Sequence, residues 1–142
     1  MRATRLVLPV LVGLVPSLAL AGCSDSSEGS AGGPVEVSEV GEGFTFKNLE
    51  VADGWTITPV ERSAAMESVT SPEIRGEVTN EGEEPVFALF EIVFAKDGEP
   101  ISRVRCSSRE IEPGATTELL CPALGVPMPE GHDQIVVQEI QR

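Results

Sequence analysis

VFALFEIVF, at residues 86–94, is apolar at every position except Glu91. A strand with one face in water alternates apolar and polar side chains, whereas a strand covered on both faces is apolar almost throughout. We therefore expect a central strand of a packed sheet here, with the rest of the fold built around it.

Shorter β signals surround this run. Residues 74–80, IRGEVTN, alternate cleanly and predict a strand with one wet face. A further strand is expected over 44–51, where the apolar spacing slips by one residue before Leu49, and others near 55–58, 101–107, 116–121 and 135–140. Asp-Gly, Glu-Gly and Pro-Gly pairs separate them, at 53–54, 81–82, 97–98 and 113–114, and mark turns, with 53–54 expected to close a hairpin. Only 63–68, SAAMES, could form a helical turn. The pattern predicts an all-β domain, an immunoglobulin-like β-sandwich of about seven strands.

Two of the three cysteines are placed to bond. If Pro113-Gly114 is a two-residue hairpin loop, paired positions have numbers that add up to 227, as do those of Cys106 and Cys121. Directly opposed residues lie within reach of a disulfide. A redox pair would favour Cys-x-x-Cys, and a thiolate metal site needs more Cys or His than this chain has. We expect one structural disulfide inside the domain.

The third cysteine ends the stretch LAGC at residues 20–23, which follows a basic start and a short apolar run. This is the pattern of a bacterial lipobox, in which the Cys23 thiol receives a diacylglycerol. A membrane-spanning helix would need about 20 apolar residues, and this run is shorter. An ordinary cleaved signal would end in an Ala-x-Ala-like site, which residues 19–21 do provide, but the cysteine two residues later favours the lipoprotein signal. We expect a lipoprotein signal peptide over 1–22, a lipidated flexible tether over 23–43 and the β domain over 44–142.

The charge of the chain excludes some classes of partner. The formal net charge is −13, and without residues 1–22 the chain keeps 8 basic and 23 acidic side chains, a charge of −15. Such a surface repels nucleic acid and anionic lipid headgroups. The single Trp and the absence of Tyr disfavour a sugar-binding platform of stacked aromatics.

Candidate sites are few. His132 and Met128 share a loop, and imidazole and thioether suit copper, but they supply too few ligands. The glutamates at 81, 83 and 84 lack the alternation of a calcium loop. Arg103 and Arg105 fall on one outward face and could contact an acidic partner, although cross-strand pairing with Glu118 is the plainer interpretation. No residues suggest a hydrolase, since the single His is not accompanied by a Gly-x-Ser-x-Gly elbow.

Three segments together resemble the core of FxLYD-type domains. They are residues 74–80, residues 90–94 with Asp97-Gly98, and residues 111–114, while the spacing of Cys106 and Cys121 is similar to that in small lipoproteins of high-GC Gram-positive bacteria. The Tyr-Asp of the family motif is replaced by residues 94–97, FAKD. The resemblance covers about 74–140. It implies an immunoglobulin-like fold outside the cytoplasm, and it brings no catalytic residues.

These observations favour one function over another. We expect a lipid-anchored, extracytoplasmic, non-enzymatic binding or interaction module on the cell membrane, without a cofactor, whose partner is a protein or another envelope component. The alternative is a metal-binding cell-envelope lipoprotein, for copper through His132 and Met128 or for calcium through its acidic loops.

Overall fold

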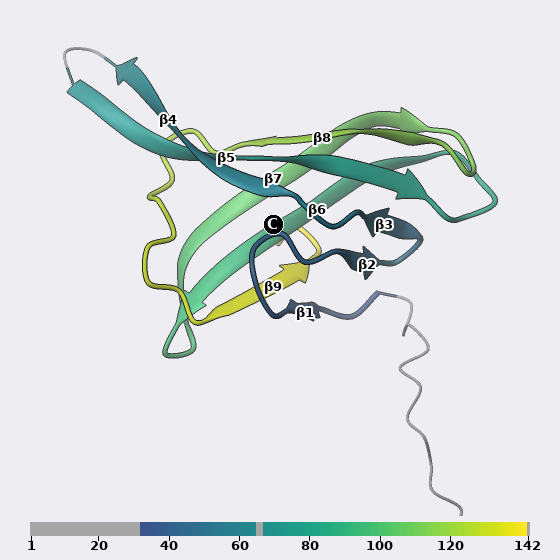
Figure 1. Ribbon diagram of the computed structural model, residues 1–142, viewed down its shortest axis with the longest axis horizontal. Helices are drawn as coiled ribbons and strands as arrows, with labels where there is room; N and C mark the ends of the chain where they lie inside the picture. Colours follow the sequence, from purple (N-terminus) through teal and green to yellow (C-terminus); the bar gives the residue numbers. More distant parts are fainter. Residues whose placement is uncertain (1–31, 65–66, 142) are drawn as a thin grey trace, which may run out of the picture.

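The computed structural model describes residues 32–64 and 67–141 (Figure 1). The expected signal peptide over 1–22, the lipidation at Cys23 and most of the expected tether lie outside the described residues.

The described chain consists of nine β-strands and contains no helix, so the all-β prediction is confirmed. The strands are β1 (Val35–Val37), β2 (Phe44–Phe46), β3 (Leu49–Val51), β4 (Thr56–Ala64), β5 (Glu67–Asn80), β6 (Val86–Lys96), β7 (Glu99–Ile111), β8 (Thr116–Pro122) and β9 (Gln134–Gln138). They form one antiparallel path, β1-β9-β6-β7-β8-β5-β3-β2, and β4 pairs with β5 off this path. The count is higher than the expected seven because β1, β2 and β3 are separate three-residue strands.

The sheet bends until it is nearly closed on itself. β1 and β2 are the two ends of the path, yet they lie next to each other in space (Figure 1). The inner face holds the core, and Phe44 of β2 packs edge-on against Phe90 of β6, with ring centroids 5.9 Å apart. Strands from opposite halves of the path therefore pack face to face.

A tryptophan fills the core beside β5. Trp55 is only 2% exposed, and its indole Nε1 donates to the Glu42 carbonyl at 2.6 Å. Gly76 of β5 permits this packing, because a Cβ on Gly76 would lie 2.9 Å from the Trp55 Cβ. The absence of a side chain at 76 is thus a packing requirement.

Asp53-Gly54 does not close a hairpin. β3 and β4 both run antiparallel to β5 along the same edge of it, and they do not pair with each other. The pairing register shifts by two residues between them, from Val51↔Val78 to Thr56↔Arg75. The segment between these strands bulges out of the ladder and inserts Trp55 into the core, so burial of this side chain outweighs the local turn signal.

The expected helical turn at 63–68 is also wrong. β4 continues to Ala64 and β5 begins at Glu67, with Ser63 opposite Ser68. Six residues make too short a helix to be stable alone, whereas strand pairing extends a ladder that already exists. The β4–β5 pair forms an arm that projects beyond the other strands (Figure 1).

The folded part begins earlier than the expected boundary at residue 44. β1 lies within the segment assigned to the tether and pairs with β9, Val35 opposite Val137. The side chain of Val37 is 5% exposed and belongs to the core.

Residues 86–94 lie in β6, which is an interior strand as predicted. Both of its edges are paired only over 91–95, with β9 on one side and β7 on the other. Over 86–90 the described ladders join β6 to β7 alone. The run that predicted a central strand is thus central for half of its length.

Candidate functional site

The predicted disulfide is present. Cys106 of β7 and Cys121 of β8 are bonded, with Cα atoms 4.3 Å apart, and both side chains are fully buried. The ladder contact Ser107↔Leu120 has the predicted register, and the Ala115 N–H donates to the Glu112 carbonyl across Pro113-Gly114 at 3.0 Å. The pair belongs to the core of the domain and is therefore a structural element.

Arg103 contacts a carboxylate of its own chain. Its Nη1 lies 3.3 Å from the Glu91 Oε2, and the Gln138 Nε2 donates to the same oxygen at 3.3 Å. Glu91 is 3% exposed, so this ion pair neutralises a nearly buried charge. Arg105 stands opposite Glu91 in the β6–β7 ladder and is exposed. The partner of Arg103 is thus Glu91 and not the expected Glu118.

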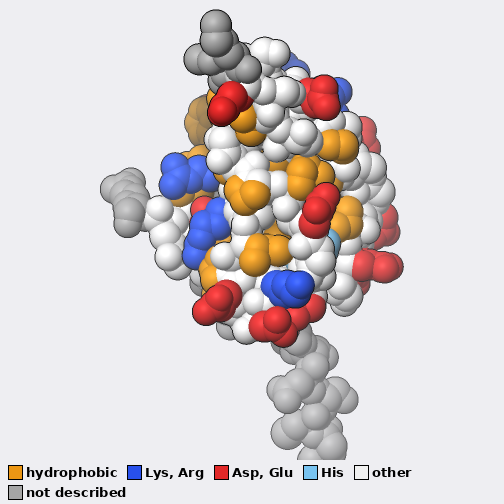
Figure 2. Space-filling view, turned by 90° about the vertical axis from the view of Figure 1, so that its left-hand side faces the viewer, with side chains coloured by type: hydrophobic (Ala, Val, Ile, Leu, Met, Phe, Trp, Pro, Cys, Tyr) orange, Lys and Arg blue, Asp and Glu red, His pale blue; other side chains and the backbone are white. Residues whose placement is uncertain are grey.

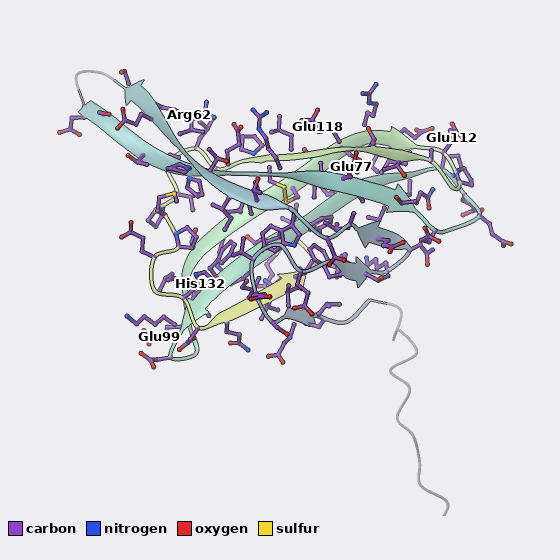
Figure 3. All side chains as sticks on the ribbon, in the orientation of Figure 1. Arg62, Glu77, Glu99, Glu112, Glu118 and His132 are labelled. Atoms are coloured by element: carbon purple, nitrogen blue, oxygen red, sulfur yellow. A yellow bond between two sulfur atoms is a disulfide. The ribbon has the colours of Figure 1, made fainter. Side chains whose placement is uncertain are left out.

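Glu118 lies elsewhere, on β8 opposite Glu77 of β5. The two labelled glutamates occupy these neighbouring strands in Figure 3. On the face that Figure 2 shows, basic, acidic and hydrophobic side chains are interspersed. The charges there are mixed, which is typical of a solvated surface.

His132 joins the loop after β8 to the core. Its Nδ1 donates to the Pro129 carbonyl at 2.7 Å, and its ring packs edge-on against Phe94 with centroids 5.1 Å apart. In Figure 3 it lies near the β6–β7 turn. Residues 32–64 and 67–141 contain no group of three or more His, Cys, Asp or Glu side chains arranged to hold a metal ion. The copper and calcium hypotheses gain no ligand set from these residues.

A surface that the sequence does not reveal lies at the start of β6. Phe87 is 57% exposed and Leu89 is 61% exposed, and both point away from the core because Ala88 and Phe90 alternate with them inward. An apolar groove of about 650 Å³ adjoins them. Its lining comes from the β2–β3 turn (Phe46, Lys47, Asn48, Leu49), from β6 (Val86, Phe87, Leu89) and from the chain after β9 (Glu139, Ile140). We call it the β6 groove.

The groove exists because β9 is short. β9 ends at Gln138, opposite Glu91, and the next residues leave the ladder. The preceding part of β6 therefore has no neighbour on that side among the described strands. A β-bulge between Phe87 and Leu89 marks the same stretch, and the Ala88 N–H there donates to the Ser108 Oγ at 3.0 Å. Bulges often accompany strand edges and functional sites.

An ion pair crosses one side of the groove. The Lys47 Nζ, in the β2–β3 turn, bonds the carboxylate of Glu139, and it also lies 5.6 Å from the centre of the Phe46 ring. The hydrogen bond from Lys47, together with its positive charge, lowers the pKa of the Glu139 carboxyl below its ordinary value. Both side chains are solvated, so the pair ties the chain after β9 to the β2–β3 turn only weakly.

This surface could be predicted from the sequence only if the point at which β9 ends were known. The pattern VFALFEIVF shows two apolar faces, but it does not show that β9 stops after covering half of β6. The pattern thus predicts that both faces of β6 are covered, whereas Phe87 and Leu89 are exposed.

In the part of the chain that the structure describes, no helix is both long and apolar enough to cross a membrane. Comparison with known protein families, with curated proteins and with solved structures gives no match.

Proposed function

We propose that this chain is a lipid-anchored protein of the extracytoplasmic face of the cell membrane, and that its β domain binds a protein or another envelope component without catalysing a reaction. The observation that carries the binding part is the exposure of Phe87 (57%) and Leu89 (61%) beside the β6 groove.

Exposed large apolar side chains next to a concave surface mark interaction sites. Burying one such side chain completely contributes about 1.5–3 kcal/mol. Two of them at positions i and i+2 of one strand present a continuous apolar strip, which a partner covers with a single element. The inward side chains of β6, such as Phe90, hold the strand in the core. A partner can therefore cover the outward strip without disturbing the fold.

The anchoring part rests on LAGC at 20–23 and on charge. The acidic domain has little attraction of its own for an anionic bilayer, so stable attachment needs another source. A diacylglycerol thioether supplies two acyl chains, at about 0.8 kcal/mol per buried methylene.

A labelling experiment tests the anchor. Cells that express the full chain are grown with a radiolabelled fatty acid, and Cys23→Ala is the comparison. The wild-type chain is expected to carry label and to fractionate with membranes, and the variant to lose both. A wild-type chain without label would overturn the anchor.

Photo-cross-linking tests the binding part. A photoreactive amino acid is placed at Leu89 in cells, and at Leu124 as the matched control, because Leu124 is equally apolar and 68% exposed in a loop. We expect a discrete adduct from position 89 that is absent from position 124. The same adducts from both positions, or none from 89, would contradict the proposal.

The domain is also proposed to be a divergent immunoglobulin-like sandwich of the FxLYD type. The packing of β2 against β6 across the core supports this, because the two halves of the bent path act as two facing layers. An experimental structure tests it. A break between two separate sheets is expected, and an unbroken closed ladder would contradict it.

A further inference from the structure

On the side away from β7, the edge of β6 over residues 86–90 pairs with no described strand, and Glu139 and Ile140 after β9 line the groove beside it. On that side the described ladder with β9 ends at Glu91↔Gln138, while the other side stays paired with β7 up to Val86↔Ile111. Unpaired strand edges accept extended peptides through main-chain hydrogen bonds. Five residues span about 17 Å, enough for a short recognition segment.

Side chains on both sides of this edge match an alternating peptide. Residues of an added strand that neighbour Phe87 and Leu89 would extend the outward apolar strip, because paired residues share a face. Phe87 and Leu89 also line the β6 groove together with Phe46 and Leu49, so apolar peptide residues beside them would contact the groove as well. The backbone edge thus supplies affinity, and the groove supplies specificity for an apolar side chain.

Charge decides what kind of segment fits. The exposed carboxylates of Glu83 and Glu84 precede β6, and Glu110 stands opposite Phe87 on β7. These three carboxylates outnumber the exposed Arg105 and Arg109 on β7, since Lys47 is already paired with Glu139 and Arg103 with Glu91. A second copy of this acidic chain would bring like charges together, and an anionic bilayer would be repelled. A basic segment is attracted.

We propose that an extended, basic segment of a partner protein, with apolar residues at alternate positions, adds as a strand to β6 at residues 86–90. This inference rests on the proposed binding function and names its site and the chemistry of its partner.

The test uses the full chain in detergent micelles and the peptide acetyl-Lys-Val-Lys-Val-Lys-Val-Lys-amide, with affinity measured by calorimetry. A second peptide of the same sequence has alternate backbone amides N-methylated, which removes hydrogen bonds along one edge and keeps the charge. We expect it to bind at least tenfold more weakly. Equal binding of the two peptides would overturn strand addition.

Two variants locate the site. Leu89→Ser should weaken binding about tenfold, while Leu124→Ser, the control at another exposed leucine, should leave it unchanged. Equal effects of the two, or stronger binding of the wild-type chain to anionic vesicles than to the peptide, would overturn the proposal. If the peptide fails but a specific adduct forms at position 89 in cells, strand addition is wrong and the proposed binding function stands. If the peptide binds but no adduct forms, the proposed function is wrong.

Discussion

Cys106 and Cys121 lie directly opposite each other on β7 and β8, bonded and with Cα atoms 4.3 Å apart. Their sequence separation of 15 residues makes the closed loop short. Such a crosslink stabilises a fold chiefly by restricting the unfolded chain, by about 3 kcal/mol for a loop of this size.

Reduction of the disulfide should therefore lower the free energy of unfolding by about 3 kcal/mol. Urea titrations of the oxidised and the reduced protein measure it. Identical midpoints, or two free thiols by alkylation in the oxidised protein, would contradict the structural role.

Arg103 and Arg105 provide a second, paired prediction. Arg103→Ala leaves the nearly buried Glu91 carboxylate without its cation and should destabilise the fold by about 1–3 kcal/mol. Arg105→Ala removes an exposed side chain that forms no ion pair within the described part of the chain, and it should change stability by less than about 0.5 kcal/mol. Glu91→Gln in the Arg103→Ala background should recover part of the loss. Equal costs for the two arginine variants would show that the Arg103–Glu91 pair contributes nothing.

Gly76→Ala should disturb the packing of Trp55. A Cβ at 76 would lie 2.9 Å from the Trp55 Cβ, so the strand or the indole must shift. Overpacking of this kind costs about 1–3 kcal/mol. Urea unfolding followed by the fluorescence of the single tryptophan reports both stability and environment.

The matched control is Gly33→Ala, because a Cβ at Gly33 meets no heavy atom within 4 Å. It should shift stability by less than about 0.5 kcal/mol. An unchanged emission spectrum and midpoint for Gly76→Ala would mean that the contact with Trp55 is not a constraint.

Lys47 and Glu139 give a pH-dependent prediction. Lys47 lowers the pKa of Glu139 in the folded protein, so any stabilisation from this pair is present above the unfolded pKa and is lost as the pH falls through the lowered folded value. NMR titration of the Glu139 carboxyl should give a pKa below the reference of 4.5. Lys47→Met should return the pKa to its ordinary range. An unshifted pKa in the wild-type protein would mean that the ion pair does not persist in solution.

Much of the fold could be predicted where one local signal sets the geometry. Asp97 and Gly98 both have positive φ, 52° and 80°, as a two-residue hairpin between twisted strands requires. The turn at Pro113-Gly114 likewise set the register that brought Cys106 opposite Cys121. In both cases a short turn leaves the following pairs little freedom.

The sequence predictions that the structure corrects have a common cause, because they depend on contacts between residues distant along the chain. β1 pairs Val35 with Val137, and the three residues Val35–Val37 do not by themselves indicate this partner. The contact between Arg103 and Glu91 depends on the β-bulge between Phe94 and Ala95, which shifts the β6–β7 register by one residue from that of an ideal hairpin. The exposure of Leu89 depends on where β9 ends. None of these is encoded in the local pattern.

Strand addition to β6 is tested most directly by locating a basic, extended peptide on the domain. Intermolecular nuclear Overhauser effects, recorded on the isotope-labelled full chain in micelles with acetyl-Lys-Val-Lys-Val-Lys-Val-Lys-amide, report this. We predict cross-strand contacts between the peptide backbone and residues 86–90, with valine methyl groups close to Phe87 and Leu89. Contacts confined to other surfaces, or none at a saturating peptide concentration, would contradict it.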